Sequence, residues 1–265
     1  MRLVARVFVS LLLTVVLAAA VFGGALGLHW LDGRGVFDLA LDRRPEQPVA
    51  LSSLNRYTHE AAGKAWFRRY FTTMVFSQAG DAPTGHGPVV AKWERRQVVI
   101  KLLNDGGPGV ERYLRRLVRR LDRLQPQVRF VVGDAAPRIT IRFLAHEDYV
   151  KVAGPDSVGS TSTHFYGSSP GLISARIFID EGRQAAPGER RATLIHELTH
   201  AIGCSGHFSA AADRRRSVLY ESSQITSWSQ TDAAVIRLLY SPWIRSGMTQ
   251  SQATASLQLY AASGK

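Results

Sequence analysis

Apolar residues recur with the period of an α-helix in several segments of the chain. The clearest is Gly109–Leu124, whose apolar stripe consists of Val110, Leu114, Leu117, Leu121 and Leu124. Six arginines occupy the other faces, which indicates either an anion-binding surface or an ordinary solvated helix exterior. Ser229 and Asp232 form a capping box before a later apolar run. The spacing predicts helices over residues 54–76, 109–124, 189–202, 233–240 and 248–262.

Short β-branched runs alternate with these helical segments and predict strands. The strands are expected over residues 93–103, 128–132, 138–143 and 174–180. The Ser/Thr/Gly-rich segment 158–171 suits an irregular segment or an edge strand, and the run Asn104–Pro108 is a strong turn signal. This order of strands and helices predicts an α+β domain with a small mixed sheet and a helical C-terminal subdomain.

The amino terminus has the pattern of charged and apolar residues expected of an export signal. Arg2 and Arg6 precede an uncharged run of 22 residues, Val7–Leu28, which is long enough to span a bilayer. A cleaved signal peptide has the same order of charge and apolar residues. We therefore expect residues 1–28 to be a signal peptide or membrane anchor, residues 29–50 a linker, and residues 51–265 the folded domain. Either interpretation places that domain outside the cytoplasmic membrane, anchored to the cell envelope or secreted.

The composition narrows the class of protein. The chain has 265 residues, is 45% hydrophobic and carries 20% charged residues, which excludes a disordered chain. The formal net charge of +12 suggests an anionic neighbour, but export makes nucleic acid an unexpected partner. Cys204 is the single cysteine, so an internal disulfide is excluded.

The predicted helix 189–202 contains the motif His196-Glu197-Leu198-Thr199-His200, which has the form H-E-x-x-H. Residues four apart on a helix point the same way, so the two imidazoles can share a tetrahedral zinc ion. Glu197 can then reach a metal-bound water and act as its general base. The pattern predicts one Zn²⁺ per chain, with Glu197 as the catalytic residue.

Two imidazoles and a water leave one zinc ligand to be found. Gly203 is well placed to end the helix in a left-handed conformation, after which the chain can turn back and present His207. His207 is our first choice as the third ligand. Cys204 is an alternative as a thiolate, although a small buried residue is its simpler interpretation. The carboxylate alternatives are Glu221 and, more weakly, Asp213.

The motif resembles that of the metzincin branch of zinc metalloproteases, H-E-x-x-H-x-x-G-x-x-H or D. His196, Glu197, His200 and Gly203 match this pattern, whereas Gly206 occupies the position of the third ligand and His207 follows one residue late. The segment Ser217–Tyr220 looks like the methionine turn of that family, with Leu219 in place of methionine. The resemblance implies a zincin-like fold and suggests Tyr220 as a transition-state stabiliser.

The chain is also similar to an uncharacterised family of exported bacterial proteins whose zinc helix is often degenerate. The shared features are Glu197–Gly203, Ser217–Tyr220, Leu239-Tyr240, Pro242 and Gly247-Met248. Many of those relatives lack the second histidine, which suggests that the scaffold can also serve without catalysis. This chain keeps both histidines and the glutamate.

These observations predict a zinc metallopeptidase that hydrolyses peptide or protein substrates outside the cytoplasmic membrane. An edge strand near residues 163–168 could hold an extended peptide by β-addition. The alternative is a non-catalytic envelope protein with the zincin fold, with or without zinc. A third hypothesis, a basic module for anionic polymers, depends on the arginines between Arg112 and Arg123.

Overall fold

The computed structural model describes residues 50–76, 89–166, 169–184, 186–210 and 216–264. The side chains of Tyr166, Ser169 and Pro170 are also outside this description. Residues 1–28, the linker up to residue 49, the loop 79–88 and the candidate ligand Asp213 therefore lie outside the described residues. Within the described ranges, no helix is long and apolar enough to cross a membrane.

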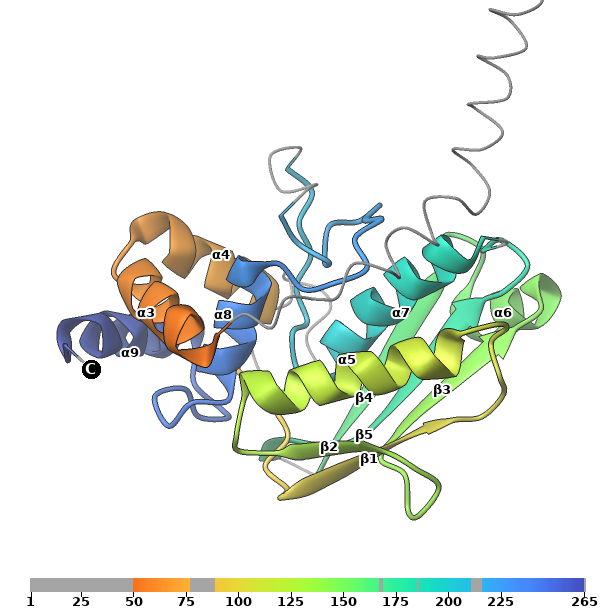
Figure 1. The fold of residues 1–265 in the computed structure, drawn as a ribbon, viewed down its shortest axis with the longest axis horizontal. Coiled ribbons are helices and arrows are strands. Elements are labelled where there is room, and N and C mark those ends of the chain that lie inside the picture. The colour runs from red at the N-terminus through yellow and green to blue at the C-terminus, as the bar shows by residue number, and fades with distance from the viewer. Residues whose placement is uncertain (1–49, 77–88, 167–168, 185, 211–215, 265) are drawn as a thin grey trace, which may run out of the picture. The chain divides into compact units, whose positions relative to one another are not determined.

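A mixed sheet of five strands organises the described residues (Figure 1). The strands are β1 (Gln97–Leu102), β2 (Arg129–Val132), β3 (Ile139–Leu144), β4 (Gly159–Tyr166) and β5 (Ser169–Asp180). Their order across the sheet is β2-β1-β3-β5-β4, and only β4 runs antiparallel to its neighbour. The predicted α+β class with a mixed sheet is thus confirmed, and the segment 158–171 supplies the edge strand β4.

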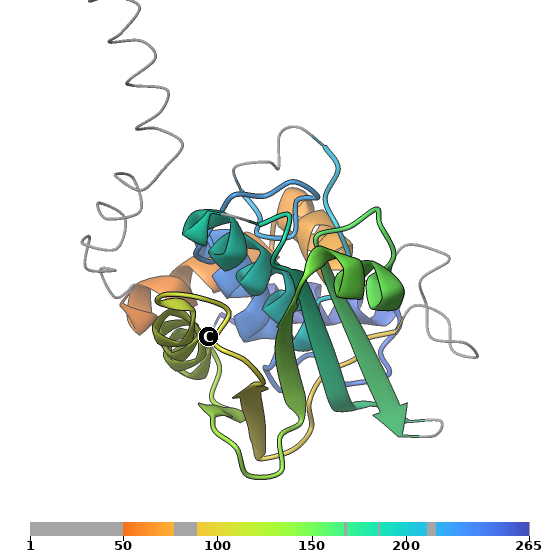
Figure 2. The same ribbon diagram turned by 90° about the vertical axis from the view of Figure 1, so that its right-hand side faces the viewer.

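One face of the sheet is buried and the other is polar. Along β3, Ile139, Ile141 and Phe143 are buried, whereas Arg142 between them is exposed. This alternation follows from the two-residue repeat of a strand, which sends every second side chain to the same face. The buried face carries α5 (Val110–Leu124) and α7 (Pro187–Ala201), and Figure 2 shows α7 along it. All five residues of the predicted α5 stripe are buried, as expected.

The helical part of the domain draws on both ends of the chain. It comprises α3 (Leu51–Ala62), α4 (Ala65–Val75), α8 (Gln230–Leu239) and α9 (Gln250–Ala262). Helix α3 packs on α8 and α9, and α4 packs on the same pair (Figure 1). The prediction of a helical subdomain made only from the C-terminal part of the chain is therefore incomplete, because α3 and α4 also belong to it. Short helices gain most of their stability by packing an apolar face, and α8 and α9 pack theirs partly against α3 and α4.

The prediction of one helix over residues 54–76 is wrong, because the chain breaks between α3 and α4. Gly63 follows α3, and Lys64 is extended with φ −92° and ψ 137°. The guanidinium of Arg68 donates to the carbonyl oxygens of Ala62 at 3.3 Å and Gly63 at 2.8 Å. These bonds satisfy carbonyl groups that the end of α3 leaves without helical partners.

Helix α6 (His146–Ala153) was not predicted, because it is short and buries only Tyr149. It lies at one end of the sheet against β3 and β5 (Figure 2). Tyr149 donates or accepts a hydrogen bond with Ser157 at 2.6 Å. A helix of eight residues with one buried side chain carries too little periodic signal to be recognised in sequence.

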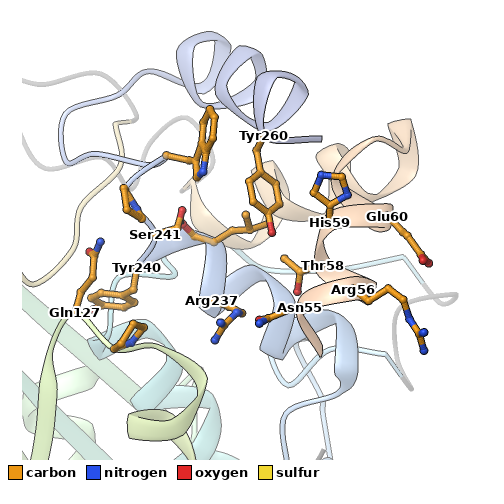
Figure 3. Close-up of a pocket in the computed structure, with 14 residues that line it drawn as sticks. Asn55, Arg56, Thr58, His59, Glu60, Gln127, Arg237, Tyr240, Ser241 and Tyr260 are labelled. Carbon is orange, nitrogen blue, oxygen red and sulfur yellow. The ribbon is translucent and has the colours of Figure 1, made fainter. Parts of the chain in front are cut away.

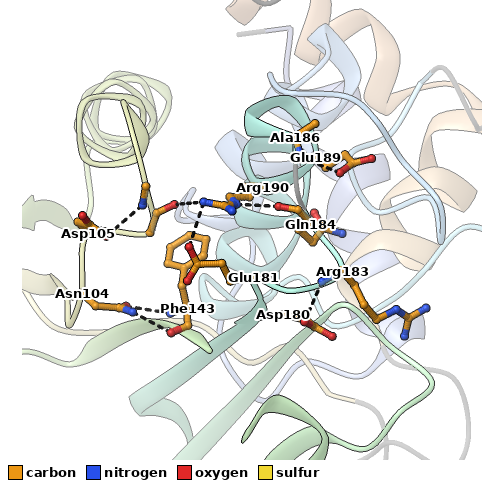
Figure 4. A network of polar contacts seen from close by, with 12 residues as sticks. Asn104, Asp105, Phe143, Asp180, Glu181, Arg183, Gln184, Ala186, Glu189 and Arg190 are labelled. Carbon is orange, nitrogen blue, oxygen red and sulfur yellow. Dashed lines mark hydrogen bonds and ion pairs between the residues drawn. The ribbon is translucent and has the colours of Figure 1, made fainter. Parts of the chain in front are cut away.

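Arg190 fastens the start of α7 to the turn after β1 (Figure 4). Its guanidinium donates to the carbonyl oxygens of Gly106 at 3.0 Å and Gln184 at 2.7 Å, and lies 3.2 Å from the carboxylate of Glu181. Asn104 exchanges two hydrogen bonds with the backbone of Phe143 and so joins the same turn to β3. The helix that carries the histidine motif is therefore anchored at its first turn.

Candidate metal centre

Helix α7 presents His196 and His200 on one side, as their four-residue spacing predicts. Their ring centroids are 4.8 Å apart. Leu194, Ile195 and Leu198 on the same helix are buried, so the helix is held against the sheet by its apolar side. The group that faces the two imidazoles comes from a later segment of the chain.

His207 returns to these imidazoles through a tight reversal of the chain. Gly203 has φ +105°, and a side chain there would collide with the carbonyl oxygen of Ala91. Gly206 donates its amide hydrogen to the carbonyl oxygen of Met74 at 3.1 Å. Only glycine permits the positive φ of residue 203 and its close approach to Ala91. The left-handed helix end predicted at Gly203 is therefore confirmed.

The three imidazoles converge through their Nε2 atoms. The Nε2 atom of His207 lies 3.2 Å from that of His196 and 3.0 Å from that of His200. The candidate ligand atoms of all three lie within 4.8 Å of one another. In the part of the chain that the structure describes, no other group of histidine, cysteine or acidic side chains has this arrangement.

Backbone carbonyl groups set the orientation of two of the rings. The Nδ1–H of His196 donates to the carbonyl oxygen of Val218 at 2.8 Å, and that of His200 to the carbonyl oxygen of Cys204 at 2.6 Å. A carbonyl oxygen accepts only, so each neutral ring carries its proton on Nδ1 and leaves a lone pair on Nε2. Both lone pairs point at His207, which can donate at most one hydrogen to them.

This arrangement fits a zinc ion. With Zn–N distances of about 2.0–2.1 Å, tetrahedral geometry places ligand nitrogens roughly 3.3–3.4 Å apart. The two separations at His207, 3.0 and 3.2 Å, are close to this value. A cation among the three nitrogens would also remove the repulsion between their lone pairs. Three histidines leave one tetrahedral position open, which is typical of catalytic zinc sites.

The surroundings keep the imidazoles neutral, which is the form that binds metal. Burial lowers the pKa of His196 to about 4, with a further contribution from His207. Burial also lowers the pKa of His200 well below its usual value, and the two neighbouring histidines add to the effect. Both rings are therefore uncharged at neutral pH.

Glu197 turns its carboxylate toward the edge strand β4. The hydroxyl of Thr161 donates to Oε2 at 2.7 Å and to the backbone oxygen of Glu197 at 3.0 Å. Gly159 lies so close that a side chain there would collide with Oε1. Glu197 is 5% exposed, and this burial raises its pKa to about 7, although the bond from Thr161 acts in the opposite direction. The carboxylate is therefore enclosed between α7 and β4.

Residues 64–259 match the family described as "Protein of unknown function (DUF2927)". The chain belongs to this family. The match covers all the described strands, α4 to α8 and the three clustered histidines of this DUF2927 chain. No curated protein matches the chain.

Among the described residues, the side chains of the alternative ligands Cys204 and Glu221 do not join the cluster. Cys204 is fully buried, burial raises the pKa of its thiol, and its carbonyl oxygen rather than its sulfur faces His200. Glu221 is exposed and outside the group of three. Tyr220 is half-buried, and its backbone pairs with Phe208. His164 on β4 is exposed.

Sequence reasoning missed two supports of this site in the DUF2927 chain. Thr161 lay in a segment recognised only as rich in Ser, Thr and Gly. Asp232 was recognised as part of a capping box, which is confirmed by the bonds between Ser229 and Asp232. Its carboxylate also accepts from the hydroxyl of Tyr70 at 2.8 Å and from the Ser217 hydroxyl at 3.0 Å. No spacing rule in the sequence relates α4, α8 and the loop at Ser217.

Proposed function

We propose that this chain is a zinc-dependent peptidase with a metzincin-like fold that acts outside the cytoplasmic membrane. The observation that carries the proposal is the convergence of three Nε2 atoms, with His207 at 3.0 Å from His200 and 3.2 Å from His196. His196, His200 and His207 would hold the metal, and Glu197 follows His196 directly on the same helix.

Two further features favour the metzincin-like interpretation. The amide of Tyr220 donates to the carbonyl oxygen of Ser217 at 3.4 Å, which closes a tight turn, and Leu219 in this turn is buried. The turn contacts His196 through the Val218 carbonyl oxygen. This is the place that the metzincin resemblance assigns to the methionine turn, with Leu219 as the apolar residue.

The chemistry follows from the residues around the histidines. With zinc bound, the site gains a Lewis acid that polarises a peptide carbonyl and makes water a nucleophile at neutral pH. Glu197 accepts the proton of the attacking water and passes it to the leaving amine. Thr161 holds the Glu197 carboxylate through its hydroxyl.

The edge strand β4 supplies a surface for an extended substrate. It pairs on one side with β5, and its first residue, Gly159, adjoins the Glu197 carboxylate. A peptide added along the outer edge of β4 would gain backbone hydrogen bonds. It would place a peptide bond near Glu197, which favours a peptide or protein substrate.

One observation favours a second candidate, a non-catalytic envelope protein that keeps the zincin fold. Glu197 is only 5% exposed, and its carboxylate already accepts a hydrogen bond from Thr161. A general base that remained enclosed in this way would not reach a water molecule.

The test combines metal analysis with peptide cleavage on the purified full chain. The peptidase hypothesis expects one zinc per chain and cleavage of a broad peptide library, with cleavage lost in Glu197→Gln while zinc is retained. Bound zinc without cleavage of any peptide would favour the non-catalytic protein. Absence of zinc binding would overturn the proposed metal centre.

A further inference from the structure

A cavity of about 610 Å³ lies in the helical part of the domain, and none of the three clustered histidines lines it (Figure 3). Its walls are α3, the end of α8 with the loop that follows it, α9, and the turn before β2. Its volume is within the range of cavities that enclose small organic ligands, which is about 300–1,000 Å³.

Aromatic rings form one side of this cavity. Tyr260 from α9 packs edge to face against Trp243, with ring centroids 5.7 Å apart, and against His59, at 5.3 Å. Tyr240 adds a buried ring whose hydroxyl donates to the carbonyl oxygen of Ile202 at 2.8 Å. Such a wall favours a flat apolar group.

Hydrogen-bond donors form the opposite side. Arg237 donates one N–H to the carbonyl oxygen of Leu124 at 2.8 Å, which fixes the guanidinium and leaves its other N–H groups available. Gln127 turns its Oε1 atom toward the ammonium of Lys92, 3.5 Å away, so its amide hydrogens are available as donors. Asn55 and Arg56 also line the cavity, and Figure 3 shows Asn55 beside Arg237.

The charge of the lining is unbalanced. Arg56 and Arg237 line the cavity with one carboxylate, that of Glu60. No ion pair joins either arginine to a carboxylate among the residues that the structure describes. Burial lowers the pKa of Arg237, because its guanidinium is partly removed from water. A carboxylate ligand would supply the missing negative charge and could bind a guanidinium through two parallel hydrogen bonds.

We propose that this cavity is a binding site for a small aromatic carboxylate, with the carboxylate on Arg237 and the ring against Tyr260 and Trp243. A simple anion would leave the aromatic wall unused, and a neutral aromatic molecule would supply no negative charge opposite the guanidinium. The aromatic wall and the guanidinium together favour a ligand that has both an aromatic ring and a carboxylate.

The test is equilibrium binding of phenylacetate to the full chain, measured by calorimetry and by the change in intrinsic tryptophan fluorescence. Saturable binding is expected, with phenylacetamide and acetate each at least tenfold weaker. Arg237→Gln should weaken phenylacetate binding at least tenfold, and Arg237→Lys should recover part of the loss. Arg245→Gln, an exposed arginine in the neighbouring loop that does not line the cavity, is the matched control.

Arg56→Gln keeps the proposal testable if the Arg237 variants fail to fold, because Arg56 is exposed on α3. It should weaken phenylacetate binding by severalfold. Equal binding of phenylacetamide, unchanged binding in both glutamine variants, or no saturable binding would overturn the proposal. Binding must also survive in the double variant His196→Ala, His200→Ala. Its loss there would place the carboxylate at the metal centre and overturn the second site while leaving the proposed peptidase intact.

Discussion

The Nδ1 atom of His196 lies 2.8 Å from the carbonyl oxygen of Val218, a residue 22 positions further along the chain. The amide of Val218 in turn donates to the buried carboxylate of Asp232 at 3.3 Å. A residue of α8 therefore reaches the first histidine through the backbone of a single residue, Val218. Such outer contacts fix the tautomer and the orientation of a metal-binding ring.

Removing any of the three histidines should abolish stoichiometric zinc binding. We expect one zinc per wild-type chain by elemental analysis and well below one in His196→Ala, His200→Ala and His207→Ala. Because zinc would bind the folded chain, a chelator should lower the melting temperature of the wild type and leave that of the variants unchanged. His164→Ala, on exposed β4, is the control and should retain its zinc. Full zinc occupancy in His207→Ala would exclude that residue as a ligand.

Glu197→Gln should lower peptide cleavage by about 10²-fold or more without loss of zinc, because the amide cannot accept the proton. Thr161→Val should lower cleavage by a smaller factor, since it removes the hydroxyl that holds the carboxylate at 2.7 Å. Thr163→Val, on the same strand, is the matched control and should cleave normally. Equal cleavage by the Thr161 and Thr163 variants would show that the hydroxyl does not position Glu197.

Asp232→Asn should weaken zinc affinity about tenfold and destabilise the fold by about 1–3 kcal/mol. The hydroxyl groups of Tyr70 and Ser217 both donate to the Asp232 carboxylate. In Asp232→Asn, the side-chain NH₂ group would be a hydrogen-bond donor facing these donors. Ser229→Ala removes the α8 cap and should cost about 1 kcal/mol with zinc affinity unchanged. Isothermal titration and urea unfolding measure the two effects. An Asp232→Asn variant that loses stability but not zinc affinity would restrict Asp232 to a structural role.

Gly203→Ala should destabilise the chain by several kcal/mol, because the positive φ is strained for alanine and the new methyl would meet the Ala91 carbonyl oxygen. The control is Gly154→Ala, which has φ +83° and no neighbouring atom within 4 Å of the added carbon. That variant should cost about 1–3 kcal/mol for the backbone strain, because φ +83° with ψ 170° is a conformation essentially confined to glycine. Urea unfolding compares the two, and equal losses would mean that packing against Ala91 contributes nothing.

Lys92 should make stability rise with pH in alkaline solution. Lys92 is 6% exposed, and burial lowers the pKa of its ammonium from 10.5 to about 8. Between these two values the unfolded chain binds a proton that the folded chain has released, so folding becomes more favourable as pH increases. The free energy of unfolding of the wild type relative to Lys92→Met should increase by about 3 kcal/mol between pH 7.5 and 10.5.

Urea unfolding at several pH values measures this difference, and the contributions of other groups cancel between the two proteins. A flat difference would contradict the prediction. It would mean that the carbonyl oxygens of Leu239 and Ile244, at 2.9 and 2.5 Å from the ammonium, keep Lys92 charged throughout.

Local patterns in the chain were sufficient to predict α5, the left-handed end of α7 and the shared side of His196 and His200, whereas the pattern of residues 158–171 suited either an irregular segment or an edge strand. Each depends on residues only a few positions apart, and the periods of helix and strand act over that range. The break between α3 and α4 and the short α6 gave no such periodic signal.

Contacts between distant segments were decided by packing. His207 reaches His200 because Gly203 and Gly206 pass against the backbones at Ala91 and Met74, which lie more than 100 residues earlier. Thr161 meets Glu197 across the junction of β4 and α7, and α3 and α4 complete the helical cluster with α8 and α9. Such contacts depend on how apolar faces bury one another across the whole domain, and no local repeat in a single sequence encodes that choice.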